Sequence, residues 1–581
     1  MDRQNNRRQD KFGGPLYEKL AAYGASDFYA FHMPGHKRLM GEFENPFQID
    51  ITEIDGFDDL HHPENDGVLT EAQRRAAQVF GAGETHFLVN GSTAGILSAI
   101  SGCTKYGGTL LMARNCHRSA YHGAELRGLK TVYLYPQYIP ELGINGAILP
   151  EDVENALQKP IIEKKQQADG KTEKDSGGDR EKNQNRIQTD IQAVMIVSPT
   201  YDGVCSDVRR IAGICHRYGV PLIVDQAHGA HFPFSKYFPE DAVSAGADVV
   251  IQSVHKTLPA MTQTALLHVQ GEIANRERIR KFLSIYQSSS PSYVLMASID
   301  ACVDLIERDG EELFAKHVRE LKNFRESCRE LKWLYLAGLD SEKDGIWQLE
   351  AKLAEFGQTA DFDRSKLLIS ARRANLAGAG LTGEELSRML RERYHIQMEM
   401  SGPDYVVAIA GIADSEEGFR RLAEALHGID LDISGKIKNK SVVRKNRNIR
   451  TKSVEKTQDR FKTNQTENIN EKEIPDGVKS YTKVSDKSNA LPRLESVLTL
   501  SEAAEAESVS RPLKICEGAV AGIYVYLYPP GIPVLAPGEQ VTAELLERIE
   551  KWLEAGYDVH GLETDSVGVP TLKILGNRYP E

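Results

Sequence analysis

The sequence predicts an α/β protein with a large domain built on a mostly parallel sheet, a small α/β domain and a C-terminal α+β domain. Short apolar runs alternate with helical stretches from about residue 86 to residue 269. Several runs end on a polar or charged residue, as strands do at the ligand-binding carboxyl edge of a parallel sheet. Two polar segments, 166–188 and 435–510, interrupt this pattern and mark breaks between packed units.

The chain is long enough for several domains. Its 581 residues exceed one ordinary domain and suggest about three. We divide it into an N-terminal segment (1–45), a large domain (46–300), a small domain (301–434), a linker (435–510) and a C-terminal domain (511–581). The segment 166–188 and the linker are poor in apolar residues, so we expect both to be disordered.

Charge and cysteine content bear on partners and location. The net charge of −12 argues against nucleic acid as the main partner. No apolar run is long enough to span a bilayer, and the N-terminus lacks the apolar segment of a signal peptide. The seven cysteines are scattered without paired spacing, so we expect a cytoplasmic protein with neither a disulfide framework nor a metal site.

The first motif joins a strand at 86–90 to a helix. The turn Gly91-Ser92-Thr93-Ala94-Gly95 lies between them. Small residues there let backbone N–H groups and hydroxyls close around a phosphate at the helix start. An ordinary N-cap by Ser92 or Thr93 is compatible with this reading. The Gly-Lys-Ser/Thr sequence of a nucleoside-triphosphate P-loop is absent.

Further strands are expected at 109–113, 131–135 and 191–197. His117 lies in the loop after the first of them, where it either stacks on a flat ring or stays a solvated loop residue. Two earlier loops, a basic one at 31–37 and an acidic one at 51–63, are either exposed loops or ligand contacts.

The central pair of residues is Asp225 and Lys256. An apolar run from Val220 ends on Asp225, and a second from Ala247 ends just before Lys256. Two such strands would bring an acid and an amine to one sheet edge. These are the groups that pair with a pyridinium nitrogen and form a Schiff base in enzymes that use pyridoxal phosphate (PLP). A surface ion pair is the alternative.

The rest of the chain supplies the smaller units. A long helical region at 293–330 leads to strands at 366–370 and 405–409, with a helix at 383–394 between them. In the C-terminal domain a strand at 522–528 precedes a Pro- and Gly-rich turn, and Thr542 can cap a helix that ends near residue 555.

Taken in order, these motifs resemble the prokaryotic Orn/Lys/Arg decarboxylase family of fold-type-I PLP enzymes. The resemblance rests on Phe31-His32-Met33-Pro34-Gly35-His36-Lys37, Gly91-Ser92-Thr93, the loop 114–119, Asp225 to His231, Ser253-Val254-His255-Lys256 with Met261-Thr262-Gln263, and Tyr528 to Glu539. The size resembles the shorter branch without an N-terminal wing domain, which includes the biosynthetic arginine decarboxylases of Gram-positive bacteria.

The resemblance implies an aspartate-aminotransferase-like large domain, a homodimer or larger homo-oligomer, and PLP as cofactor. By position, Lys256 would carry PLP, Asp225 would pair with the ring nitrogen, and His228 would orient Asp225 or touch the ring oxygen. His117 and Ala227 would pack on the two ring faces. The phosphate would be held by Ser92, Thr93, Ser253 and His255. Gln226 stands where the family usually has Glu, and we expect tuning without loss of activity.

The implied reaction is α-decarboxylation of a basic amino acid in polyamine biosynthesis. Arginine is favoured over lysine and ornithine. Carboxylates that could hold the distal cation of the substrate are Glu53, Asp55, Asp58 and Glu539. An aminotransferase is one alternative, with Arg372 or Arg373 binding the α-carboxylate. A non-catalytic PLP-binding regulator is the other.

Overall fold

The computed structural model describes residues 25–37, 46–51, 58–62, 67–159, 189–338, 361–455, 490–528, 531–554 and 556–576. Side chains of α13 beyond residue 438 are outside this description. The expected insertion at 166–188 lies wholly outside the described residues, as do Glu53 and Asp55.

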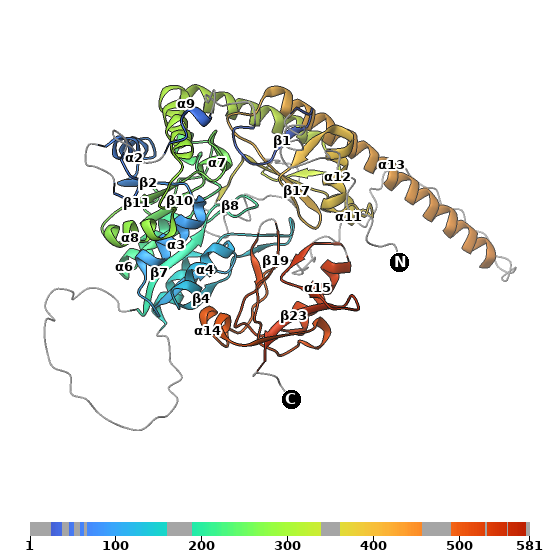
Figure 1. Ribbon diagram of the computed structural model, residues 1–581. Helices are drawn as coiled ribbons and strands as arrows, with labels where there is room; N and C mark the ends of the chain where they lie inside the picture. Colours follow the sequence, from blue (N-terminus) through green and yellow to red (C-terminus); the bar gives the residue numbers. More distant parts are fainter. Residues whose placement is uncertain are drawn as a thin grey trace.

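The large domain is a seven-stranded sheet covered by helices (Figure 1). Its strands, in spatial order, are β2 (Glu84–Leu88), β11 (Ala265–Val269), β10 (Val249–Gln252), β9 (Leu222–Asp225), β7 (Ile191–Val197), β3 (Thr109–Ala113) and β4 (Lys130–Leu134). Strand β11 pairs antiparallel with both of its neighbours, β2 and β10, and the other pairs of this sheet are parallel. The mostly parallel sheet expected from the sequence is therefore confirmed.

These strands are continuous apolar runs in the sequence because both faces of the sheet are buried. Every residue of β3, β9, β10 and β11 is buried. The helices of this domain are α2 (Val68–Val79), α3 (Gly91–Cys103), α4 (Arg118–Leu126), α5 (Pro150–Gln158), α6 (Val208–Arg217), α7 (Val254–Thr257) and α8 (Arg276–Tyr286). The chain enters α3, α4 and α7 directly after parallel strands, so these three helices begin at one sheet edge.

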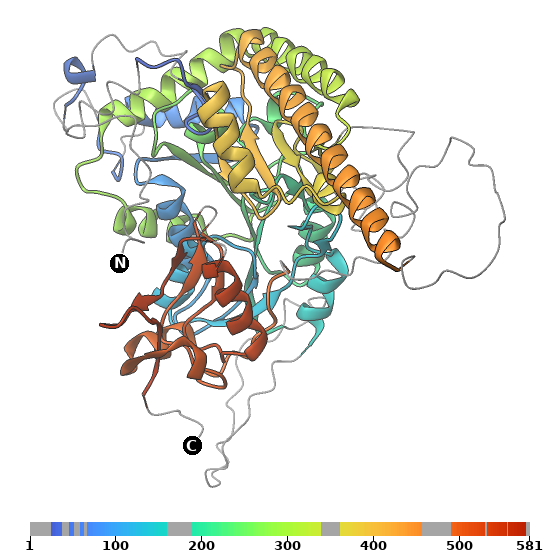
Figure 2. The ribbon, with the colours of Figure 1, turned by 90° about the vertical axis from the view of Figure 1, so that its right-hand side faces the viewer.

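The small domain is a four-stranded antiparallel sheet beneath two long helices. Its strands lie in the order β12 (Tyr335–Leu336), β14 (Lys366–Ser370), β17 (Tyr405–Ile409) and β16 (Met400–Ser401). The helices α9 (Tyr293–Ser327) and α13 (Glu416–Glu455) lie side by side over it (Figures 1 and 2). Shorter helices are α11 (Arg372–Leu376) and α12 (Gly383–Tyr394).

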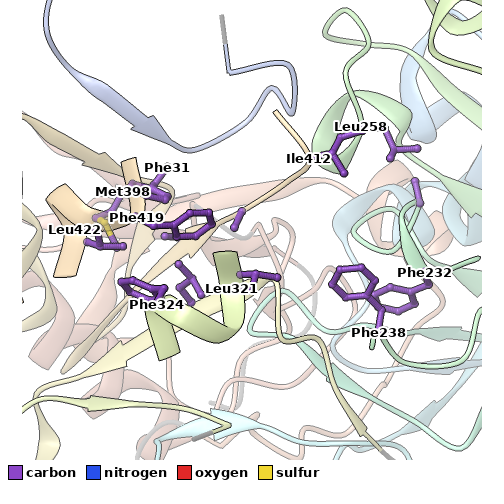
Figure 3. Packing of buried hydrophobic residues seen from close by; sticks show 14 of the residues in the cluster. Phe31, Phe232, Phe238, Leu258, Leu321, Phe324, Met398, Ile412, Phe419 and Leu422 are labelled. Carbon is purple, nitrogen blue, oxygen red and sulfur yellow. The ribbon is translucent and has the colours of Figure 1, made fainter. Parts of the chain in front are cut away.

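The N-terminal segment belongs to this small domain. Strand β1 (Tyr29–Phe31) pairs in parallel with β15 (Ile396–Met398). Phe31 packs with Met398, Phe419 and Leu422 in the apolar core shown in Figure 3. After β1 the chain turns at Gly35, whose N–H donates to the His255 carbonyl at 2.7 Å. A Cβ at Gly35 would lie 2.6 Å from the Leu258 carbonyl oxygen, so only glycine fits there.

The C-terminal domain contains two three-stranded antiparallel sheets. One has the order β18 (Ser508–Pro512), β23 (Pro570–Leu575), β22 (Glu563–Thr564) and the other β20 (Pro533–Leu535), β19 (Val525–Leu527), β21 (Val559–His560). Its helices are α14 (Leu500–Glu505), which packs on α4, and α15 (Ala543–Glu554).

The ends of the expected linker are more ordered than the sequence suggested. Residues 435–455 continue helix α13. Leu494 and Leu500 are buried, and α14 begins with a capping box between Thr499 and Glu502. The short apolar clusters at 491–503 are diluted by polar neighbours, so composition alone joined them to the linker. No helix in the described ranges combines the length and apolarity needed to cross a bilayer.

Candidate active site

A cavity of about 560 Å³ opens at the carboxyl edge of the large sheet. It is bounded by the N-terminal loop at Met33, by the ends of several sheet strands and by Tyr528 of the C-terminal domain. All nine residues expected to bind cofactor or act in catalysis line it: Ser92, Thr93, His117, Asp225, Ala227, His228, Ser253, His255 and Lys256. A smaller cavity of about 400 Å³ beside α2 contains none of them.

One end of the cavity has groups that can bind an anion. Helix α3 starts at Gly91, after Asn90 as N-cap, and no side chain caps its first turn. Its free N–H groups therefore face the same region as the hydroxyls of Ser92 and Ser253, which lie 2.5 Å apart. Ser92 and Thr93 lie inside the helix, so neither is its N-cap. The interpretation of this turn as an anion site is unaffected.

His255 borders this end as a neutral ring. Its Nδ1–H donates to the Thr264 carbonyl at 2.7 Å, which leaves Nε2 as the acceptor. Burial lowers the pKa of His255 to about 4.

Asp225 supplies a buried carboxylate at the end of β9. It accepts a hydrogen bond from the Ala227 N–H at 3.1 Å and is 4% exposed. Burial raises its pKa, and the nearby Lys256 amine offsets part of that rise. A buried carboxylate of this kind is stabilised by a cation, and a protonated pyridine nitrogen would provide one.

Lys256, His117 and His228 form the basic side of the site. Burial lowers the pKa of Lys256 and lowers that of His117 to about 4. His117 caps α4 by accepting from the Ser119 N–H at 3.3 Å, which fixes its ring. His228 Nε2 lies 3.1 Å from the Lys256 amine, and its Nδ1 lies 2.8 Å from the Lys366 amine. His228 thus bridges two lysines and, among the described contacts, makes no hydrogen bond to Asp225.

Gln226 lies outside the cavity wall. It is buried, and its side chain accepts from the Ala242 N–H and contacts Gln252. Gln226, which replaces the family's Glu, therefore packs against the sheet behind Asp225 and does not line the cavity.

The substrate candidates are not brought together. Asp58 accepts a hydrogen bond from the Leu69 N–H at 2.9 Å and so satisfies the first turn of α2. Glu539 lies 3.0 Å from Arg114 in an ion pair with both side chains at most 1% exposed. Neither lines the cavity. A distal-cation role for Asp58 or Glu539 within one chain thus lacks support, because each is committed to a structural contact.

Arg372 and Arg373 are also occupied elsewhere. Arg372 pairs with Asp404 at 3.1 Å, and Arg373 stacks on the Tyr335 ring at 4.7 Å. Neither lines the cavity, so the feature that favoured an aminotransferase is missing from this site.

Sequence reasoning missed Glu399 and Lys366. The Glu399 carboxylate accepts from the Tyr201 hydroxyl at 2.5 Å and from the Met33 N–H at 2.9 Å. Tyr201 and Met33 both line the cavity, so Glu399 stands directly behind its wall. Both missed residues come from the small domain, and no local pattern marks a residue that reaches a site more than a hundred positions earlier in the chain.

The cavity fits PLP on its own geometry. It joins a helix start with two hydroxyls, a buried carboxylate and a buried amine. Asn115 also lines it, and the buried Asn115 Oδ1 has no hydrogen-bond partner among the described residues. An unpaired buried acceptor at a cavity wall is expected where a ligand supplies the donor.

Comparison with known proteins identifies the family. Residues 14–418 match the Orn/Lys/Arg decarboxylase major domain, and residues 489–579 match the C-terminal domain of the same family. The chain is 27% identical to an arginine decarboxylase of Bacillus anthracis, over 99% of each chain. It is 28% identical to an arginine decarboxylase of Bacillus subtilis, over 95% of this chain and 96% of that protein.

The fold comparison agrees. The lysine decarboxylase of Francisella novicida superposes with a TM-score of 0.65 at 20% identity, covering 98% of this chain and 82% of that one. The two matched domains span the cavity wall and the unit that carries Tyr528. The chain therefore belongs to the Orn/Lys/Arg decarboxylase family and is an amino acid decarboxylase.

Proposed function

We propose that this enzyme catalyses the PLP-dependent α-decarboxylation of a basic amino acid, with arginine as the favoured substrate and lysine and ornithine next. The observation that carries the proposal is that Lys256, Asp225 and the anion-binding start of α3 line one cavity. The arginine preference is supported by relatives named arginine decarboxylase that align over at least 95% of this chain. The product would be agmatine, which is a precursor for polyamines.

The cofactor would be held by the chain's own residues at both ends. Ser92, Ser253 and the first N–H groups of α3 would bind its phosphate, and Asp225 would face its ring nitrogen. When bound, PLP supplies an electron sink for the electrons of the breaking Cα–carboxylate bond. The roles of Thr93, His117, Ala227 and His255 as ring and phosphate contacts stay predictions.

The proton chemistry would fall to Lys256 and its neighbours. Because burial lowers the pKa of Lys256, its ammonium form gives up a proton more readily than that of an exposed lysine. His117 and His228 stay neutral because burial lowers the pKa of each. We therefore expect Lys256 to deliver the proton that replaces the lost carboxylate, as general acid.

Glu399 is our candidate for recognition of the distal cation. Its carboxylate stands behind Tyr201, one hydrogen bond from the cavity surface. A guanidinium group bound against this pair would gain charge-assisted hydrogen bonds. Glu53 and Asp55 stay candidates from the acidic N-terminal stretch, from the same chain or from a second copy.

The test is a product assay on purified protein with PLP. Arginine, lysine and ornithine are supplied separately, and Lys256→Ala serves as the control. The proposal predicts carbon dioxide and one amine, most rapidly from arginine, with both lost in the variant. Bound PLP with keto-acid formation would favour an aminotransferase, and bound PLP with no product would favour a non-catalytic binder.

We also propose a cytoplasmic homodimer. The seven cysteines are unpaired, as in a reducing compartment. Sedimentation equilibrium would reveal the assembly, and a monomer with full activity would exclude the dimer as a requirement.

A further inference from the structure

A buried chain of three basic groups runs from the cavity into the small domain. Lys256 Nζ lies 3.1 Å from His228 Nε2, and His228 Nδ1 lies 2.8 Å from Lys366 Nζ. Lys366 begins strand β14 and is fully buried. Among the described residues, His228 is the only hydrogen-bond partner of the Lys366 amine, so this amine is held against the histidine.

The histidine couples the protonation of the two lysines. A neutral imidazole has one N–H, so it donates to one amine and must accept from the other. When Lys366 is an ammonium group, His228 accepts from it at Nδ1 and donates from Nε2 to Lys256, which must then be a free amine. In the opposite arrangement, Lys256 carries the charge and Lys366 is neutral. The two arrangements differ only in the position of protons along the chain.

The surrounding charges favour the proton on Lys366. Three carboxylates raise the affinity of Lys366 for a proton, namely Asp363, Glu399 and Asp202. Two act on Lys256, and one of these, Asp225, would be engaged by the cofactor ring. Three other groups face this row of basic side chains. They are the Tyr201 ring, 5.3 Å from Lys366 Nζ, and the neutral His117 and His255 beside Lys256. Burial lowers the pKa of Lys366 to about 8, so it is mostly charged at neutral pH.

We propose that Lys366 is a positioning residue for the reaction: before the cofactor binds, it holds through His228 the proton that Lys256 would otherwise carry, and so keeps Lys256 a free amine. The step moves the Lys256 proton to His228 Nε2 and the His228 Nδ1 proton to Lys366, with no change of net charge or oxidation state. The inference rests on the proposed function only in taking Lys256 as the cofactor-binding amine.

The test measures the reactivity of Lys256 without turnover. The full-length protein, freed of cofactor, is labelled briefly with trace acetic anhydride across a pH range, and acetylation of Lys256 is quantified by mass spectrometry. Because only the free amine reacts, the midpoint of labelling reports the Lys256 pKa. We expect Lys366→Met to raise this midpoint by about one pH unit, which lowers labelling about tenfold at lower pH. Lys281→Met, an exposed lysine on α8, should leave the midpoint unchanged.

Two further variants separate charge, coupling and misfolding. Lys366→Arg keeps a cation against His228 and should preserve the wild-type midpoint. His228→Asn should raise the midpoint as much as Lys366→Met does, and the double variant should show no further shift. If Lys366→Met does not fold, Lys366→Arg and His228→Asn still test whether Lys366 acts on Lys256 through His228. An unchanged midpoint in His228→Asn, or equal shifts in the Arg and Met variants, would overturn the proposal.

A second readout uses PLP itself. The rate of covalent PLP uptake, followed by absorbance, should acquire the same shifted pH dependence in Lys366→Met. A protein that takes up PLP normally and yields no amine from any substrate would refute the decarboxylase function while leaving this inference intact.

Discussion

Glu539 was a candidate for binding the distal cation of the substrate, but its carboxylate forms a buried ion pair between two domains. Its carboxylate lies 3.0 Å from Arg114 Nη2 and accepts from the Ala536 N–H at 2.8 Å. Arg114 also donates to the Tyr121 hydroxyl at 2.7 Å and to the Pro533 carbonyl. Arg114 belongs to the large domain and Glu539 to the C-terminal domain, so the pair joins the two units.

Glu539→Ala should loosen this junction. Removing one partner of a buried ion pair leaves an uncompensated charge and costs about 3–5 kcal/mol. Hydrogen exchange of the backbone amides in β19 and β20 should then be faster by roughly two to four orders of magnitude, since each 1.36 kcal/mol corresponds to a factor of ten. The matched control is Glu544→Ala, because Glu544 pairs with Arg548 but is 81% exposed, and its loss should cost less than about 1 kcal/mol.

A double variant should recover the stability lost in Glu539→Ala. Replacing both partners, as in Arg114→Met with Glu539→Leu, should restore much of the protection because neither charge is then buried. Normal exchange in Glu539→Ala together with a large rise in KM for the amino acid would refute the structural reading. That result would return Glu539 to the substrate site.

Three further predictions concern His317, Glu399 and Asp58. His317 lies among Phe238 and Phe419 with neither ring nitrogen hydrogen-bonded among the described residues, and burial lowers its pKa from 6.5 to about 3. The unfolded chain therefore binds more protons than the folded chain between these values, so stability falls as pH drops below 6.5. Acid titration of unfolding should show that His317→Phe removes about 3 kcal/mol of this loss between pH 6.5 and pH 4. Glu399→Gln should raise KM for arginine about 10- to 100-fold with a smaller change in kcat, and an unchanged KM in steady-state kinetics would exclude Glu399 from recognition of the cation. Asp58→Ala should cost about 0.5–2 kcal/mol of stability through the first turn of α2 and leave KM unchanged, whereas a raised KM at normal stability would place Asp58 in substrate binding.

Local sequence patterns were sufficient for several strands and one helix. The strands β3, β7, β14 and β17 and the helix α12 have the ends that the sequence predicts. Helix α12 begins with a capping box between Thr382 and Glu385. The residues proposed to bind the cofactor lie on loops or first helical turns soon after predicted strands, so predicting the strands also located most of the cavity wall.

Contacts between distant segments were not predictable in this way. Arg114 and Glu539 lie 425 residues apart, and each alone resembles an exposed charge near a loop. Glu399 reaches the cavity wall because β15 pairs with β1, and Lys366 reaches His228 because β14 begins beside that histidine. The sequence contains the groups, but tertiary packing decides which of them meet.

The pairing of β1 with β15 also sets a time constraint during synthesis. Met33 and Glu399, which flank this contact, are separated by 366 residues. At translation rates of about 5–20 residues per second, the ribosome needs roughly 20–70 s to produce the partner of β1. Gly35 follows β1 and donates its N–H to the His255 carbonyl next to Lys256, so β1 must be placed by β15 before this contact can form. The site proposed for PLP is therefore complete only late in the synthesis of each chain.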